Sequence, residues 1–158
     1  MKRALIAAAA LLAMGAPALA QRRDSATVVF VCEHGTVKSV IALAHFERLA
    51  RERGLPVRAI SRGTAPDARL PEFMVRALRA EGFHVDAFAP TRFDSSALAG
   101  AIHVVSFDVP PLPVTTVPVE RWDQLPSVTA DYARGSSAIK ARVEALVDSL
   151  AAALKARP

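Results

Sequence analysis

The chain has a single cysteine, Cys32, among its 158 residues. One cysteine excludes an internal disulfide and any metal site built from several thiolates. Four histidines are scattered along the chain without the spacing of metal ligands, so we expect neither a metal nor another cofactor. Because an isolated thiol is a liability in an oxidising compartment unless it is buried or used, Cys32 needs an explanation.

Long apolar runs are equally scarce. Residues 1–20 begin with two basic residues, continue with an apolar run over residues 4–13 and end on Ala-Leu-Ala before Gln21, which is the pattern of a secretory signal peptide. That run is too short for a membrane span, and no later segment approaches the ~20 apolar residues that a span needs. We therefore expect a cleaved signal peptide, a periplasmic or secreted protein, and no stable membrane insertion.

A strong charge of one sign is also missing. The net charge is +5, and it falls to +3 without residues 1–20, which hold two of the 20 Lys and Arg residues. Basic and acidic residues alternate along the rest of the chain, so nothing supports a nucleic acid as a partner. The part that remains, residues 21–158, has the commonest size of one domain, and we expect a single domain and a monomer.

Short apolar strands alternate with helices from residue 27 onward. Strands are predicted over residues 27–32, 56–60, 85–88 and 101–107. Helices are predicted over residues 37–53, 71–82 and 95–99, and along an apolar stripe over 139–154. Prolines exclude regular structure from much of the stretch 108–135, which we expect to be a long irregular connection. The alternation predicts an α/β fold, a three-layer sandwich with a small, mainly four-stranded parallel sheet flanked by helices.

The residues around Cys32 predict an anion site. Cys32 ends the first predicted strand, and ligands bind at this edge of an open parallel sheet, where the following helix points its positive end and free N–H groups outward. Lys38 and Ser39 follow in the first turn of that helix, so a thiol, a cation and a hydroxyl converge there. The backbone between them should form an anion nest. The residues expected to bind phosphate are Glu33, His34, Gly35, Thr36, Val37 and Lys38.

Cys32 itself has two interpretations. A lone cysteine at a strand end is more often a small buried apolar residue. We favour a nucleophile, because the strand, the Lys38 and Ser39 offsets and the helix start occur together, and because the helix end and Lys38 favour the thiolate. A nucleotide P-loop is excluded, since it needs a glycine directly before the lysine. His34 also has two interpretations: it either adds positive charge to the loop or forms a hydrogen bond with its own backbone at the surface.

The run that begins at Cys32 resembles the signature of the low-molecular-weight protein-tyrosine phosphatases and of the arsenate reductases that share their fold. The family motif is Cys, five residues, Arg, and then Ser or Thr, directly after the first strand. Lys38 stands where the family has Arg, and Gly35 where it commonly has Asn. Further segments similar to the family are residues 59–64, 82–86 and 119–123.

The resemblance implies attack of Cys32 on phosphorus, a cysteinyl-phosphate intermediate, and its hydrolysis, with an aspartate of a late loop protonating the leaving oxygen. Lys38 would take the role of the arginine, at a rate penalty of roughly 10²–10³, because an ammonium lacks the planar bidentate contact of a guanidinium. The family usually carries Asp-Pro in the late loop, and this chain has no Asp-Pro. Asp123 and Asp131 are the substitutes, with Asp131, which Tyr132 follows, slightly preferred.

Three functions are open on these grounds. The first is hydrolysis of phosphomonoesters, among them phosphotyrosine, with reduced efficiency. The second is a catalytically inactive module that binds an oxyanion, so that the partner is either a phosphorylated substrate or an inorganic oxyanion. The third is a thiol-dependent arsenate reductase, which ranks last because Cys32 has no second cysteine for a disulfide relay. Trp122 and Tyr132 either wall the pocket or pack in the core.

Overall fold

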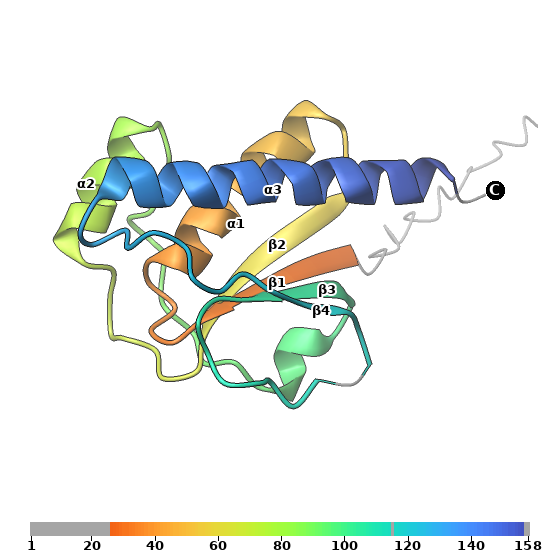
Figure 1. Ribbon diagram of the computed structural model, residues 1–158, viewed down its shortest axis with the longest axis horizontal. Helices are drawn as coiled ribbons and strands as arrows, with labels where there is room; N and C mark the ends of the chain where they lie inside the picture. The colour runs from red at the N-terminus through yellow and green to blue at the C-terminus, as the bar shows by residue number, and fades with distance from the viewer. Residues whose placement is uncertain (1–25, 115, 157–158) are drawn as a thin grey trace, which may run out of the picture.

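A four-stranded parallel sheet organises the chain. The computed structural model describes residues 26–114 and 116–156, and the expected signal peptide lies outside them. The strands are β1 (Ala26–Cys32), β2 (Val57–Gly63), β3 (Ala101–Ser106) and β4 (Val119–Arg121). Their order is β2-β1-β3-β4, so β1 is central and pairs with both β2 and β3 (Figure 1).

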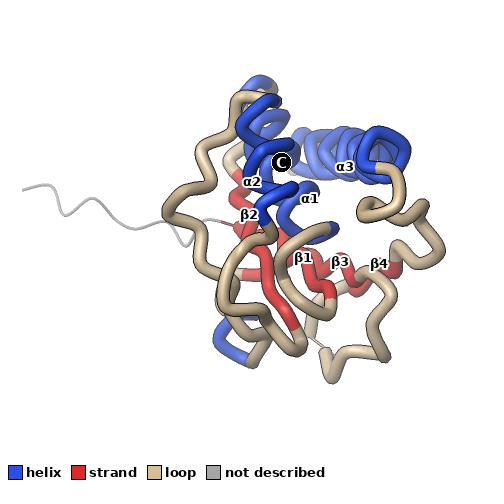
Figure 2. Tube along the Cα trace, turned by 90° about the vertical axis from the view of Figure 1, so that its left-hand side faces the viewer, coloured by secondary structure: helices blue, strands red, loops and turns tan. Residues whose placement is uncertain are grey.

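The helices cover the two faces of the sheet unequally. The three α-helices are α1 (Lys38–Glu52), α2 (Glu72–Ala80) and α3 (Tyr132–Lys155). All three lie on one face, whereas among the described residues the other face carries Phe93, the 3₁₀ helix η1 (Ser95–Leu98) and the proline-rich segment after β3 (Figure 2). The predicted α/β class and four-stranded parallel sheet are confirmed, with a thin third layer. None of the helices within the described residues is long and apolar enough to span a bilayer.

One predicted strand is wrong. Residues 85–88 form a turn, in which the N–H of Phe88 donates to the carbonyl of Val85 at 3.1 Å. Val85 is the only buried residue of the four, and the carboxylate of Asp86 lies at the surface in an ion pair with Arg79. Val85 and Phe88 pack against the core from a turn, and their spacing of three residues does not place them on one face of a strand.

The fourth strand lies instead in the stretch 108–135, which we predicted to be irregular. Val119–Arg121 pairs in parallel with the last residues of β3. All three of its residues are exposed, so no apolar pattern marks it. Pro118 is compatible with this edge position because the pairing uses only its carbonyl, which accepts the N–H of Val104 at 2.9 Å.

The last helix begins at Tyr132, earlier than its apolar stripe. Asp131 caps it, and the carboxylate accepts the N–H of Arg134 at 3.0 Å. A Cβ at Gly135 would lie 2.8 Å from the Cα of Val128. The preceding loop packs so closely here that position 135 requires glycine, which is a poor helix former and hid the helix start from the sequence pattern.

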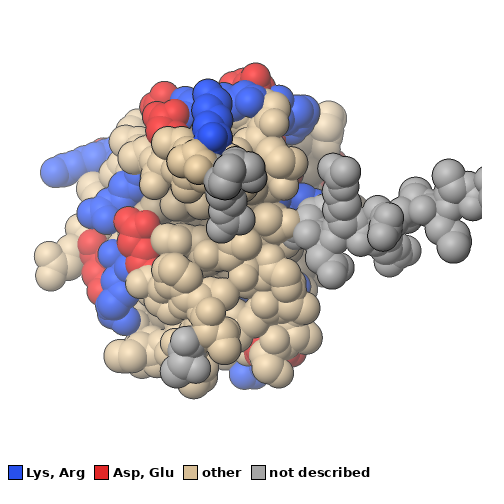
Figure 3. All heavy atoms as spheres, turned by 90° about the vertical axis from the view of Figure 1, so that its right-hand side faces the viewer, with Lys and Arg blue, Asp and Glu red and all other residues tan. Residues whose placement is uncertain are grey.

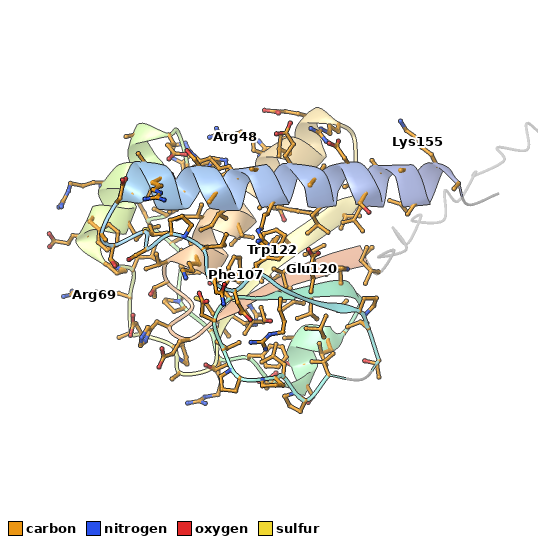
Figure 4. The ribbon with its side chains drawn as sticks, in the orientation of Figure 1. Arg48, Arg69, Phe107, Glu120, Trp122 and Lys155 are labelled. Carbon is orange, nitrogen blue, oxygen red and sulfur yellow. The ribbon has the colours of Figure 1, made fainter. Side chains whose placement is uncertain are left out.

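Aromatic side chains fill the space between the sheet and the α-helices. Phe30, Phe46, Phe107 and Trp122 are each at most 1% exposed. The rings of Phe107 and Trp122 meet edge to face with centroids 5.5 Å apart, beneath α3 (Figure 4). Of the two roles left open for Trp122, the structure therefore supports core packing.

Glu81, directly after α2, connects three helices. Its carboxylate accepts the hydroxyl of Tyr132 at 2.8 Å and lies 2.9 Å from both the Nζ of Lys140 and the Nε2 of His45. Burial by itself would raise the pKa of Glu81, but the hydrogen bonds from Lys140 and Tyr132 and the nearby positive charges lower it. Of the two roles left open for Tyr132, the structure therefore supports packing, since its hydroxyl joins α3 to Glu81.

The surface carries charges of both signs. Figure 3 shows one end of the molecule, where Lys and Arg side chains lie beside Asp and Glu side chains without forming a patch of one sign. Charges of opposite sign also form ion pairs, such as those of Arg53 with Glu144 and Asp148 on α3.

The end of β2 supports the loop that follows β1. Gly63 pairs with Cys32 in the sheet register. A Cβ at Gly63 would lie 2.9 Å from the N of Gly35 and from the carbonyl carbon of His34. The N–H of Thr64 donates to the carbonyl of Cys32 at 3.1 Å. The loop after Cys32 is therefore held against the backbone of β2.

The substitution Gly63→Ala tests this contact. Its methyl group would overlap loop backbone atoms, so we expect a loss of about 1–3 kcal/mol in the free energy of unfolding, measured with urea, and weaker phosphate binding. Gly54→Ala is the control: Gly54 has a φ of 63° and no atom within 4 Å of its Cβ. That strain should cost about 1–2 kcal/mol and leave phosphate binding unchanged. Equal effects of the two variants on phosphate binding would contradict the contact.

Candidate active site

A cavity of about 390 Å³ opens where β1 and β3 end. Three segments that are far apart in the sequence line it: the loop after β1, Phe107 and Asp108 after β3, and the segment 125–129 before α3. Figure 2 faces this edge of the sheet, where the strands give way to loops. Of the six predicted phosphate-binding residues, all except Gly35 line the cavity together with Cys32: Glu33, His34, Thr36, Val37 and Lys38.

The sulfur of Cys32 lies among hydrogen-bond donors. Its Sγ accepts the N–H of Gly35 at 3.2 Å and lies 3.0 Å from the Oγ of Ser39. The hydroxyl of Ser61 on β2 donates to the Oγ of Ser39 at 2.8 Å, which leaves the Ser39 proton for the sulfur. Cys32, Ser39 and Ser61 are all buried. Two hydrogen-bond donors from different parts of the loop and helix therefore hold the sulfur in place.

The loop backbone offers further donors. Gly35 has a φ of 65°, which glycine adopts without strain. Among the described residues, the N–H groups of Glu33, His34, Thr36 and Val37 donate to no protein acceptor. The first turn of α1 also has no side-chain cap. Free amides and an uncapped helix start at one place are what an oxyanion site requires.

Lys38 shares its charge with a carboxylate. It is the only Lys or Arg that lines the cavity in the described part of the chain, and its Nζ forms an ion pair with the Oδ2 of Asp108. The Oδ1 of Asp108 accepts the N–H of Gln124 at 2.9 Å. Burial alone would raise the pKa of Asp108, but the hydrogen bonds from Lys38 and Gln124 and the charge of Lys38 lower it. Asp108 is therefore a carboxylate at neutral pH.

The two predicted acids lie away from the cavity. Asp123 accepts the N–H of Asp108 and the Nε–H of Arg121, both at 2.9 Å. Asp131 caps α3 through the N–H of Arg134. Neither carboxylate lines the cavity, although residues 127–129 just before Asp131 do. The structure thus brings Cys32, Lys38 and Ser39 together and leaves Asp123 and Asp131 outside.

The outer side of the loop is tied to Asp67. Its carboxylate accepts the hydroxyl of Thr36 at 3.1 Å and lies 3.3 Å from the Nδ1 of His34. The other ring nitrogen of His34 faces the carboxylate of Glu33 at 3.6 Å. These side chains brace the loop from outside. No group of His, Cys, Asp or Glu side chains within the described residues is arranged to hold a metal ion.

Sequence reasoning missed Ser61 and Asp108. Ser61 is a buried hydroxyl among apolar positions of β2, an exception that can be seen in the sequence but has no motif. Asp108 comes two residues after the end of β3, at the same edge of the sheet as Cys32. Because the carboxyl ends of parallel strands meet at one edge, that position was a signal that we did not use.

The sequence and the fold can be compared with known proteins. Residues 27–109, slightly more than half of the chain, match the sequence profile of the family described as Low molecular weight phosphotyrosine protein phosphatase. No curated protein matches the chain in sequence. A solved arsenate reductase from Archaeoglobus fulgidus is 27% identical, with a TM-score of 0.62, over 77% of this chain and 98% of that protein.

Two other solved structures support the fold alone, because their identities are low. YfkJ from Bacillus subtilis is 22% identical, with a TM-score of 0.65, over 78% of this chain and 93% of that protein. The thioredoxin-dependent arsenate reductase Cg_ArsC1' from Corynebacterium glutamicum is 19% identical, with a TM-score of 0.67. The match covers 80% of this chain but only 62% of that enzyme, less than two thirds of its length.

The stretch that matches the family profile, residues 27–109, contains most of the residues of the candidate active site. It runs from β1 through the nest to one residue beyond Asp108, and it includes Cys32, Lys38, Ser39 and Ser61. The chain belongs to the low molecular weight phosphotyrosine protein phosphatase family.

Proposed function

We propose that the protein hydrolyses phosphomonoesters through a covalent intermediate on Cys32. The observation that carries this proposal is the sulfur at the floor of the nest, which receives hydrogen bonds from the N–H of Gly35 and the hydroxyl of Ser39. Both donors fix the sulfur at the floor of the nest, where it can attack the phosphorus of a bound ester. An S–P bond forms as the ester P–O bond breaks. Water then attacks phosphorus, and the S–P bond breaks to release phosphate.

The leaving group decides which esters react. Within the described residues, only two carboxylates line the cavity, those of Glu33 and Asp108. The pKa of Asp108 is lowered and its carboxylate is paired with Lys38, so it is a poor proton donor. Esters whose oxygen leaves readily as an anion therefore suit the site. Aryl phosphates such as phosphotyrosine have this property, and alkyl phosphates do not.

The same site has a second candidate function. The pairing of Lys38 with Asp108, together with the positions of Asp123 and Asp131 outside the cavity, favours an oxyanion-binding module without turnover. An arsenate reductase is a third candidate, since the Archaeoglobus protein is described as one. That reaction would need an external thiol to release Cys32. For each candidate we propose action outside the cytoplasm, because residues 1–20 have the pattern of a signal peptide.

Hydrolysis of p-nitrophenyl phosphate in the presence of reductant tests the proposal. We expect Cys32→Ser to remove turnover, because it removes the nucleophilic sulfur. Lys38→Arg should raise kcat by at least about tenfold, because a guanidinium makes bidentate contacts with phosphate oxygens. Phenyl phosphate, with its poorer leaving group, should react much more slowly with the wild type.

Calorimetry with inorganic phosphate separates the alternatives. Phosphate binding without any turnover by the wild type would favour the oxyanion-binding module. Turnover that survives Cys32→Ser would exclude the covalent mechanism.

Asp131 can be tested as an acid separately from its role as a cap. Asn caps a helix about as well as Asp but cannot donate a proton, whereas Ala does neither. We expect Asp131→Ala to lower the free energy of unfolding by about 1 kcal/mol, measured with urea, and Asp131→Asn to leave it unchanged. Both variants should keep the kcat/KM of the wild type. Loss of the alkaline limb of the pH profile in Asp131→Asn would instead identify Asp131 as the general acid.

A further inference from the structure

We propose that Asp108 selects the charge of the ligand, so that the site prefers a singly charged tetrahedral oxyanion, such as the monoanion of a phosphomonoester, to a doubly charged one. This inference deepens the proposed function and depends on it only in treating the cavity as an oxyanion site. It assigns to Asp108 a role in specificity rather than in the chemical step.

The charges around the cavity are the first reason to expect this preference. The described side chains that line it include one cation, Lys38, and two carboxylates, Asp108 and Glu33. Glu33 is 68% exposed and largely screened by solvent, but Lys38 is 21% and Asp108 40% exposed. Asp108 neutralises Lys38 at the place where the ligand would bind. The nest amides are then the main attraction for an anion, and a second negative charge on the ligand meets repulsion from Asp108.

The second reason is that the carboxylate of Asp108 is fixed beside Lys38. Its Oδ2 pairs with Lys38, and its Oδ1 accepts the N–H of Gln124 at 2.9 Å. Its own N–H donates to the Oδ1 of Asp123 at 2.9 Å, and Asp123 is held in turn by Arg121 of β4. The carboxylate is therefore held from the ends of both β3 and β4. A ligand that needs Lys38 alone would have to break this arrangement.

The backbone conformation at Asp108 and Gln124 is a third, independent reason. Asp108 has a φ of 49° and Gln124 a φ of 59°, and they are the only non-glycine residues with positive φ in the part of the chain that the structure describes. They are also the two residues joined by the hydrogen bond at the Oδ1 of Asp108. Strained residues persist where the surroundings hold them, and they gather at functional sites. The two strained positions lie at the contact that holds Asp108 beside Lys38.

A singly charged ligand can bind without breaking the ion pair. Its oxygens accept hydrogen bonds from the nest amides and from Lys38, which has three N–H donors and can serve Asp108 and the ligand at once. The second pKa of a phosphomonoester lies near 6, so the monoanion is the main form below about pH 6. The inferred substrate form is thus this monoanion.

Calorimetry with two inert anions tests the inference. The probes are sulfate, which carries two charges, and methyl sulfate, which presents three similar oxygens with one charge. They are titrated at neutral pH and low salt into the wild type, Asp108→Asn and Asp148→Asn. Asn suits the positive φ at position 108. Asp148 is the matched control, because it is also paired with a cation, Arg53, and loses the same charge without lining the cavity.

The wild type should bind methyl sulfate at least as tightly as sulfate. Asp108→Asn should tighten sulfate binding by about tenfold or more, and methyl sulfate binding by about the square root of that factor, because Coulomb energy scales with the charge of the ligand. Asp148→Asn should change either affinity by less than about twofold. Should Asp108→Asn not fold, Asp108→Gly removes the same charge at a backbone conformation that glycine tolerates.

Two results would overturn the inference: tighter binding of sulfate than of methyl sulfate by the wild type, or equal changes for both anions on removal of the Asp108 charge. Because neither probe is hydrolysed, the outcome is independent of turnover. A protein that discriminates the anions as expected but hydrolyses nothing would contradict the proposed function and support the charge selection.

Discussion

The pairing of β1 with both of its neighbours is the constraint on which the site depends. Residues 28–31 are fully buried, and β1 is in register with β2 up to Cys32 and Gly63 and with β3 up to Val31 and Ser106. Because parallel strands end at one edge, this register brings the loop after Cys32, the end of β2 and Asp108 together. The close approach of Gly63 to the loop then decides where the nest lies.

The nucleophile and the cation of the site are supported in different ways. Cys32 is served by hydroxyls from two elements, Ser39 on α1 and Ser61 on β2, in a buried chain that ends at the sulfur. Lys38 is held by Asp108, whose position depends on β3, β4 and a strained turn. The sulfur of Cys32 thus has hydrogen-bonding partners that hold it, whereas Asp108 largely neutralises the positive charge of Lys38. This difference is the physical basis for both the low efficiency and the charge selection that we propose.

Most of the fold could be predicted where burial leaves a periodic pattern. The strand at 27–32 is continuous and apolar, and the helices after it have clear stripes, so their positions are close to those observed. The incorrect predictions concern segments in which the hydrophobic pattern of the sequence does not match the packing in the fold. Residues 85–88 contain β-favouring residues but have no strand partner, and β4 is exposed throughout, so only its hydrogen bonds to β3 define it. The start of α3 was hidden by Gly135, which packing against Val128 requires.

The sequence by itself determined the parallel α/β class, the position of Cys32 at a strand end, and the offsets of Lys38 and Ser39, because these follow from the alternation of apolar strands with helices and from spacing along the chain. Only the tertiary structure decided which distant groups reach the cavity. It placed Asp108 on Lys38 and Ser61 behind Ser39, and it left Asp123 and Asp131 outside. The physical reason is that these contacts depend on strand register and on loop paths between strands, which side-chain periodicity along the chain does not encode.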